Sequence, residues 1–351
     1  MPRYLFTIRG QSNGRRNGSL KAPETTYTPE ELNAAYDLLD ALTDEVEKVV
    51  MGKHHEVVML ITAMLAGGHV LIEDVPGVGK TTLAATLARA AGLSFKRAQF
   101  TPDVMASDIT GFNIYNRQTE SFDFKEGLVM CNILLADEIN RASPKTQSSL
   151  LESMEENRVT VDGVSYALPD PFMVIATQNP TGYVGTYPLP EAQLDRFCVK
   201  LSMGYPTLSE EIDILKKRRS VNPLEKVRAV TDIEQIRMLK DMAQNVRLDD
   251  ELYKYIVLIC AATRGHEKLS LGASPRASIM LMRMAQAYAL MHRRSYVLPE
   301  DIAAIFRHTI AHRIILKQEA RLARVTADDV LLEILRSTEF PYKAKRAAQG
   351  E

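Results

Sequence analysis

The stretch that decides the fold runs from His69 to Leu83 and reads HVLIEDVPGVGKTTL. An apolar strand leads into a glycine-rich turn, which is followed by Lys-Thr and a predicted helix. In such a turn the backbone N–H groups and the helix N-terminus face the phosphates of a nucleoside triphosphate. Lys80 is then expected to reach the β- and γ-phosphates, and Thr81 to hold Mg²⁺. The residues predicted to bind ATP here are Val75, Pro76, Gly77, Val78, Gly79, Lys80, Thr81 and Thr82.

Asp74 departs from the usual spacing of this loop, G-x-x-x-x-G-K-[ST], which places a glycine at that position. Gly77, Gly79 and the Lys-Thr pair are retained, so the loop is still expected to close. An acidic side chain at the loop entry must point away from phosphate. Taken alone, the stretch is also compatible with a glycine-rich turn that binds no ligand.

The length, composition and charge of the chain limit the classes of protein to which it can belong. The chain has 351 residues, enough for two domains, with 46% hydrophobic and 25% charged residues, which is typical of a soluble globular protein. The formal net charge is −1 and the sequence pI is about 6.7. Because dedicated nucleic-acid binders usually carry a strong basic excess, nucleic acid is not expected as a partner.

Cysteine usage and hydropathy point to the cytoplasm. The three cysteines, Cys131, Cys198 and Cys260, are odd in number and lie in apolar runs, so we expect reduced core thiols. The apolar run 57–68 is shorter than the roughly 20 residues that a spanning helix needs, so no transmembrane segment is expected. No targeting segment is visible either.

Short apolar segments alternate with helical patterns between residues 69 and 203. This alternation predicts an α/β fold with a parallel sheet covered on both faces. Helices are also expected over 28–50 and 57–66, before the first strand. Two inserts, 109–126 and 158–168, are predicted to be hairpins, and the second contains the strong turn signal Asp162-Gly163. The strands are expected at 69–73, 95–100, 132–137, 173–177 and 198–203.

After about Val221 the strands are expected to stop. The helical patterns that follow predict a smaller all-α domain, and the Met-rich stretch 280–284 fits a packed core face within it. The helices are expected at 233–245, 249–263, 275–293 and 299–315. The predicted domains are a flexible tail (1–27), an α/β core (28–221), an α-helical lid (222–340) and a C-terminal tail (341–351).

A buried strand ends in two carboxylates, Asp137 and Glu138. The phosphate-loop lysine cannot hold Mg²⁺ alone, whereas an Asp at the tip of a neighbouring strand completes such a site. Asp137 is therefore predicted to bind the metal, and Glu138 to act as general base toward water. Two solvated acids at a strand end are common in isolation, but they are less expected after a phosphate loop in an α/β pattern.

Three further polar residues are candidates for contacts with the phosphates or with the attacking water. Asn179 follows another strand and is predicted to orient the attacking water or to bind the γ-phosphate, with a simple turn at Asn179-Pro180 as the alternative. Arg196 can stabilise transition-state charge across a subunit boundary. Arg276 falls in the first turn of a helix, where a cation opposes the helix dipole, so it is expected to serve a bound phosphate. An ordinary salt bridge remains open for it.

Four strings together carry a family resemblance. They resemble the MoxR branch of the AAA+ ATPases, and the resemblance covers roughly residues 30–340. The strings are DEINRASPKTQ (137–147), ATQNP (176–180), YPLPEAQLDRF (187–197) and GASPR (272–276).

The resemblance implies roles for the residues that the patterns single out. Lys80 and Thr81 correspond to the Walker A motif of the family, and Asp137 and Glu138 to its Walker B motif. Asn179 corresponds to sensor 1. ATP and Mg²⁺ are therefore the expected cofactors, in a P-loop ATPase of the AAA+ type.

The same resemblance extends to the remaining features. Arg196 corresponds to an arginine finger that acts on a neighbouring subunit, and Arg276 to sensor 2. The inserts at 109–126 and 158–168 are similar to the helix-2 insert and the pre-sensor-1 hairpin. Lys53 departs from the adenine-side box of the family, which usually ends in Gln.

The resemblance implies an ATPase that assembles into a homo-oligomeric ring, expected to be a hexamer. Its implied role is chaperone-like: it remodels or matures a client protein, often one with a von Willebrand A domain and its own metal site. Metal insertion, as in a chelatase, is a narrower form of the same role. These partners follow from analogy with the family.

Two rival functions remain open from the sequence. One is a DNA-translocating ring motor, because ring helicases carry the same hairpin inserts, although the near-neutral charge argues against it. The other is an interaction scaffold gated by ATP and turning over slowly.

Overall fold

The computed structural model describes residues 27–75, 77–178, 186–217 and 223–341. The predicted tails, 1–27 and 341–351, fall almost entirely outside these ranges, and so does the predicted core–lid boundary at 221/222.

A five-stranded parallel sheet lies at the centre of the α/β part, in the strand order β2-β5-β8-β1-β9. Strand β8 and its two neighbours, β5 and β1, are almost wholly buried, as expected for a sheet covered on both faces. All five predicted strands are present, with ends that differ by a few residues. The bounds are β1 Val70–Glu73, β2 Phe95–Gln99, β5 Ile133–Asp137, β8 Met173–Gln178 and β9 Val199–Leu201.

Helices cover this sheet. The first begins after Thr28, whose hydroxyl accepts a hydrogen bond from the Glu31 N–H, while the Glu31 carboxylate accepts one from the Thr28 N–H. The helix predicted at 57–66 is present, and its residues 57–65 are all buried. The helices are α1 Pro29–Glu47, α2 His54–Leu65, α3 Lys80–Ala90, α4 Ala106–Thr110, α5 Pro144–Glu156, α6 Glu191–Leu194 and α7 Leu208–Lys217, with short 3₁₀ turns at Ile139–Arg141 and Pro223–Lys226.

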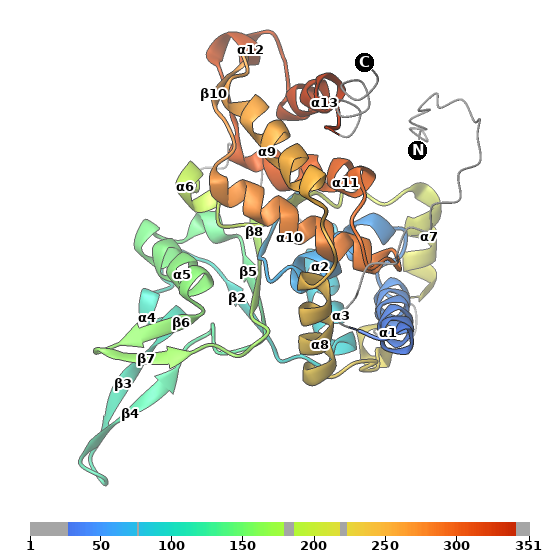
Figure 1. Cartoon of the computed structure of the whole chain (residues 1–351). Coiled ribbons are helices and arrows are strands. Elements are labelled where there is room, and N and C mark those ends of the chain that lie inside the picture. Colours follow the sequence, from blue (N-terminus) through green and yellow to red (C-terminus); the bar gives the residue numbers. More distant parts are fainter. Residues whose placement is uncertain (1–26, 76, 179–185, 218–222, 342–351) are drawn as a thin grey trace, which may run out of the picture.

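Both predicted hairpins are confirmed, and they extend together away from the sheet (Figure 1). They are formed by β3 Gly111–Asn116 with β4 Ser121–Glu126, and by β6 Arg158–Val161 with β7 Val164–Ala167. Asp162 and Gly163 both have positive φ (48° and 82°), as the predicted tight turn requires. The rings of Phe124 and Tyr166 stack 3.8 Å apart, so the two hairpins are packed against each other.

The C-terminal part is mainly helical, as predicted. It contains α8 Ile233–Gln244, α9 Asp250–Arg264, α10 Pro275–Met291, α11 Pro299–Ile310, a 3₁₀ turn Ala311–Arg313, α12 Gln318–Leu322 and α13 Ala327–Ser337. Met284 in α10 is fully buried and Met280 and Met282 pack against the core, which confirms the core-face interpretation of this stretch.

The expectation that strands stop after residue 221 is wrong in one place. A small antiparallel pair joins β10 Leu269–Leu271 to β11 Ile315–Leu316. The helix predicted to run to residue 315 ends at Ile310, and Ile314 is extended. Segments of two or three residues are too short to show a strand period, so the sequence pattern could not reveal them.

One hydrophobic cluster joins the lid to the sheet. Alternate side chains of the strands face opposite sides, so Val70 and Ile72 belong to a cluster with α1, α2 and α10, whereas Leu71 belongs to a second cluster with α5. The lid is therefore packed directly on the core.

All three cysteines are buried and free, as predicted. Burial raises the pKa of Cys131 to about 11 and that of Cys198 to about 12, so both thiols stay protonated. Among the residues that the structure describes, no helix combines the length and apolar character needed to cross a membrane.

Candidate functional site

The loop between β1 and α3, predicted to bind phosphate, contains two glycines with a left-handed backbone. Gly77 and Gly79 have φ values of 89° and 96°, in the left-handed region. No atom lies within 4 Å of a Cβ placed on Gly77, so glycine is needed there for backbone conformation and not for space. The first turn of α3 contains no acidic residue, so its N-terminus is suited to an anion. Pro76 lies outside the described residues.

Lys80 is the first residue of α3 and is largely buried. Its ammonium donates to the main-chain oxygen of Asp74 at 2.9 Å. Burial lowers the pKa of Lys80, and the carboxylates of Asp137, Asp74 and Glu138 partly oppose this effect. The lysine predicted to bind phosphate thus lies in the electrostatic range of the predicted Walker B pair.

The carboxylate of Asp74 bridges the start of the loop and the segment that follows β9. One oxygen accepts from the Val75 N–H at 2.8 Å, and the other accepts from Ser202 Oγ at 3.1 Å and the Gly204 N–H at 2.6 Å. Burial raises the pKa of Asp74, but these hydrogen bonds outweigh it and the net shift is downward. Asp74 therefore ties the phosphate loop to the segment that follows β9.

Asp137 ends β5 between two neighbouring strands. Its Oδ1 accepts from Thr177 Oγ1 of β8 at 2.7 Å, and its Oδ2 accepts from Arg97 Nη2 of β2 at 2.7 Å. The hydroxyl of Thr81 and the carboxylate of Asp137 are the hard oxygen ligands that Mg²⁺ prefers, so the residues present fit this ion.

Glu138 has a left-handed backbone, with φ of 56°, which is uncommon for a residue other than glycine. Its N–H donates to Thr177 Oγ1 at 2.9 Å. Its Oε2 accepts from Gln99 Nε2 at 3.0 Å and pairs with Arg141 Nη1 at 3.1 Å. The predicted base is thus oriented by three neighbouring elements.

Asn179 lies outside the described residues, so its role stays a prediction. The strand that leads to it, β8, lies between β5 and β1. Because the carboxyl ends of parallel strands meet at one edge, the end of β8 at Gln178 lies between the ends of β1 and β5, which lead to the phosphate loop and to Glu138.

The two predicted arginines lie together. Arg196 Nη1 pairs with Glu155 Oε2 at 2.9 Å and donates to the main-chain oxygen of Leu151 at 2.5 Å. Arg276 Nη2 pairs with the other oxygen of Glu155. The salt bridge left open for Arg276 is therefore present, and it shares its carboxylate with Arg196.

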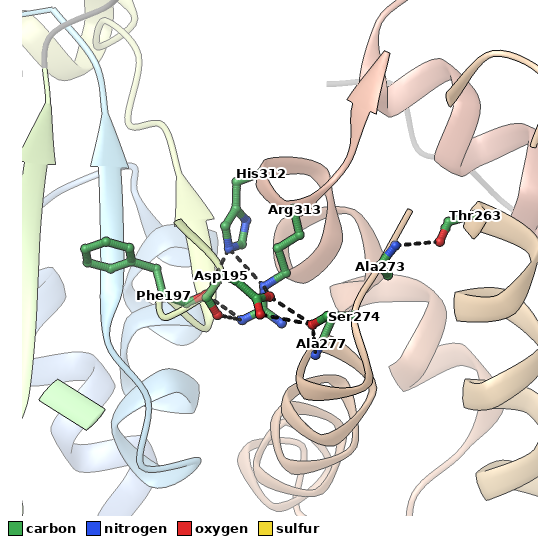
Figure 2. Close-up of polar contacts among 8 residues, drawn as sticks. All are labelled: Asp195, Phe197, Thr263, Ala273, Ser274, Ala277, His312 and Arg313. Atoms are coloured by element: carbon green, nitrogen blue, oxygen red, sulfur yellow. Dashed lines mark hydrogen bonds and ion pairs between the residues drawn. The ribbon is translucent and has the colours of Figure 1, made fainter. Parts of the chain in front are cut away.

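A buried junction fixes the backbone beside both arginines (Figure 2). Asp195 accepts from Ser274 Oγ at 3.0 and 3.2 Å, and Arg313 Nε lies 3.4 Å from the same carboxylate. Arg313 also donates to the main-chain oxygen of Phe197 at 2.6 Å, which accepts from His312 Nε2 as well at 2.9 Å. The residue before Arg196 is thus joined to the lid.

Ser274 has a second role in this junction. Its hydroxyl accepts from the Ala277 N–H at 3.1 Å and so caps α10, the helix that carries Arg276 in its first turn (Figure 2). Burial lowers the pKa of the Arg313 guanidinium, while the charge of the partly exposed Asp195 raises it.

Sequence reasoning missed Arg97, Gln99, Thr177 and Glu155. Thr177 could have been found, because it is the first polar residue after the apolar run 173–176 and stands two positions before the predicted Asn179. Glu155 carried no signal, because it is one of three glutamates in the last two turns of α5.

Comparisons with known proteins agree with this geometry. A profile of the ATPase family associated with various cellular activities (AAA) matches residues 69–199, and a profile of the AAA lid domain matches residues 261–334. The first range contains the phosphate loop, Asp137, Glu138 and Arg196, and the second contains Arg276 and Arg313.

Relatives match nearly the whole chain. The uncharacterized protein YeaC of Bacillus subtilis (strain 168) is 50% identical over 308 residues, which cover 88% of this chain and 96% of YeaC. Chaperone MoxR1 of Mycobacterium tuberculosis is 39% identical over 330 residues, covering 92% of this chain and 87% of MoxR1. The crystal structure of a proposed ATPase from Cytophaga hutchinsonii superposes with a TM-score of 0.83 at 38% identity, covering 88% and 97% of the two chains.

Proposed function

Because the chain belongs to the MoxR family of AAA+ ATPases, we propose that each of its sites of ATP hydrolysis is built from two copies of the chain. One copy binds the nucleotide through Lys80 and the loop around it. The neighbouring copy supplies Arg196 and Arg276 to the phosphates. The roles of single residues in this site are proposals that rest on the geometry described above.

The position of Arg196 at the far edge of the sheet carries this proposal. Lys80 and Asp137 follow the carboxyl ends of β1 and β5, whereas Arg196 comes before the start of β9, which is parallel to β1. The Cys198 N–H donates to the His69 main-chain oxygen at 2.8 Å, at the amino end of β1. With about 3.3 Å per residue, a strand of this length separates the two edges by roughly 10–15 Å. This separation supports action of Arg196 on a nucleotide held by another copy.

Contacts of this kind are head-to-tail, because the phosphate-loop side of one copy meets the arginine side of the next. Heterologous contacts of this type form a ring when the rotation closes. The family resemblance implies a hexameric ring.

Within each site, different residues have different roles in ATP hydrolysis. Lys80 and the backbone N–H groups bind the phosphates, Glu138 accepts a proton from the attacking water, and Asn179 orients that water. Thr81 and Asp137 hold Mg²⁺, which neutralises charge on the phosphate oxygens when bound. Chelation of divalent cations should therefore abolish hydrolysis, and added Mg²⁺ should restore it.

The test of the shared site compares Arg196→Ala with the wild type. We expect turnover to fall by roughly a hundredfold or more, because arginine fingers contribute on that scale, while ATP affinity changes little. Wild-type turnover per subunit should also rise with protein concentration toward a plateau. Arg247→Ala is the matched control, because this exposed lid arginine pairs with Asp249. Wild-type turnover in Arg196→Ala would reject the shared site.

The hairpin surface supports a protein client. Phe112, Ile114, Tyr115 and Phe122 on the β3–β4 hairpin are 42% to 69% exposed. The hairpin segment 111–126 contains two basic residues (Arg and Lys) and three acidic residues, a balance of −1. Exposed aromatic side chains suit a protein surface, whereas a DNA motor needs basic groups facing phosphates.

We propose that the client is matured or remodelled in a chaperone-like manner, and that it carries a von Willebrand A domain, with metal-cofactor insertion as a narrower form. Tagged Glu138→Gln protein, loaded with ATP in its own cell lysate, should capture such a protein, whereas Lys80→Ala should not. Phe122→Ser should weaken capture without changing basal hydrolysis. Nuclease-sensitive capture of DNA would instead indicate a DNA motor.

Two contacts of Glu138 favour the alternative of a slow, ATP-gated scaffold. The carboxylate of Glu138 is held by Gln99 and Arg141, and a base engaged in this way must be released before it accepts a proton. Turnover measured in the presence of the captured client separates the two: stimulation supports the remodelling ATPase, and unchanged slow turnover supports the scaffold.

A further inference from the structure

Glu155 joins two arginines that come from different parts of the chain. Its Oε2 pairs with Arg196 Nη1 at 2.9 Å, and its Oε1 pairs with Arg276 Nη2. Arg196 precedes β9 in the α/β core, whereas Arg276 lies in the first turn of α10 in the lid. A single carboxylate therefore contacts both guanidinium groups, and it shares the anchoring of Arg196 with the main-chain oxygen of Leu151.

The backbone beside these arginines is held independently of Glu155. The junction of Asp195, Ser274 and Arg313 fixes the residue before Arg196 and the cap of α10. The contacts of Glu155 are made only with the guanidinium ends. Loss of this carboxylate should therefore loosen the ends of the two side chains while their backbone stays in place, with Arg196 keeping its bond to the main-chain oxygen of Leu151.

The helix that carries Glu155 connects two functional regions. α5 begins shortly after Glu138, and Gln147 of this helix donates to the Ile139 main-chain oxygen at 3.1 Å. At its other end, Asn157 has a left-handed backbone (φ 51°) and leads directly into the β6–β7 hairpin. A movement of the hairpin would therefore be passed to Glu155 through a short and continuous piece of chain.

We propose that Glu155 is a positioning residue that holds Arg196 and Arg276 while the neighbouring site is empty and competes for them with the phosphates that this site binds. The inference rests on the proposed shared site. A guanidinium binds carboxylate and phosphate through the same fork of N–H groups, so an arginine engaged with one is less available to the other. Displacement of α5 by the hairpin on client binding weakens the carboxylate contacts and releases both arginines together.

The ion pairs of Glu155 with the two arginines are weak, because all three side chains are partly exposed. Glu155 is 36% exposed, Arg196 28% and Arg276 41%. Ion pairs at such sites are screened by water and salt, so each contributes little. The carboxylate of Glu155 slows hydrolysis by holding the arginines, and a bound phosphate displaces it. Removal of the carboxylate should therefore change the rate of ATP hydrolysis only several-fold.

The test is the ATPase rate of Glu155→Gln, which keeps the size of the side chain and removes its charge. We expect kcat to rise by roughly twofold to fivefold, as expected from weak exposed pairs, with KM for ATP unchanged. Glu155→Asp, which retains the charge, should return kcat toward the wild-type value. Glu152→Gln is the matched control, because Glu152 is an exposed glutamate one turn earlier in α5.

A triple variant separates positioning from a general structural effect. If Glu155 acts through the two arginines, Glu155→Gln should have no further effect on the residual rate of the Arg196→Ala/Arg276→Ala protein. An unchanged or lowered kcat in the Glu155→Gln single variant, or the same relative increase in the background that lacks both arginines, would overturn the proposal. Wild-type turnover in Arg196→Ala alone would reject the shared site itself, so the two failures are distinguishable.

Discussion

At the scale of single residues, Lys80 is the residue proposed to bind phosphate. Its ammonium is buried, donates to the Asp74 main-chain oxygen, and lies at the start of a helix whose first turn has no acidic residue. The type and spacing of Lys80, Thr81, Asp137 and Glu138 were readable from the sequence, because these motifs are local. The pairing of Arg196 with Glu155 was not, since it joins residues about 40 positions apart.

Substitution of this lysine tests the phosphate loop. Lys80→Ala should weaken ATP binding at least tenfold, because a charge-assisted hydrogen bond contributes about 1.5–3 kcal/mol. Titration with a fluorescent ATP analogue measures the change, and a thermal melt checks that the fold is retained. Equal affinity in the variant and the wild type would count against the assignment of this loop.

The buried ring of His69 should make the free energy of unfolding depend on pH. Its Nδ1 accepts from the Val174 N–H at 3.0 Å, so the neutral ring donates through Nε2 to the Met154 main-chain oxygen at 3.0 Å. Burial lowers the pKa of His69 to about 4. Because the folded pKa lies below the unfolded value near 6.5, the unfolded state binds more protons between these values, and the free energy of unfolding falls as pH falls from about 6.5 to 4.

The expected loss from this histidine is on the order of 2 kcal/mol at pH 5. Urea unfolding at pH 7.5 and pH 5 measures it. His69→Gln, which has no titrating ring, should show a smaller difference between the two pH values. An equal difference in both proteins would mean that His69 does not cause the loss.

At the scale of elements, the parallel strands bring the candidate residues together. β1, β5 and β8 are neighbours, so the phosphate loop, the Walker B pair and the chain leading to Asn179 all leave the sheet at its carboxyl edge. The strands and both hairpins were predictable, because their apolar runs and turn residues are clear signals in the sequence. The pair β10–β11 was not, because strands of two or three residues have no period.

Asp74 connects β1 to the segment after β9 and gives a prediction at this scale. Asp74→Gly restores the usual loop residue but removes the bonds to Ser202 and Gly204. We expect the free energy of unfolding to fall by about 2 kcal/mol, because hydrogen bonds to a charged group are lost. Urea midpoints of Asp74→Gly and Asp74→Asn measure it, with a smaller loss expected for Asn. A stabilised Asp74→Gly protein would show that the side chain is dispensable.

At the scale of the whole molecule, the lid and the sheet share one hydrophobic cluster and are joined by the buried Asp195–Arg313 pair. A change in the lid is therefore transmitted to the residue beside Arg196. The family was predictable from the four motif strings, and the helical lid from the helical patterns after residue 221. The core–lid junction was not, because Arg313 lies outside those strings and its burial depends on packing between distant elements.

The central claim is that one copy supplies the phosphate loop and the next copy supplies the arginine. The most direct test mixes Lys80→Ala and Arg196→Ala proteins, each inactive alone, after dissociation and reassembly. Random mixing in equal amounts should make about a quarter of the contacts competent, so activity should recover to roughly a quarter of the wild-type rate. Confirmed subunit exchange with no recovered activity at any mixing ratio would contradict the shared site.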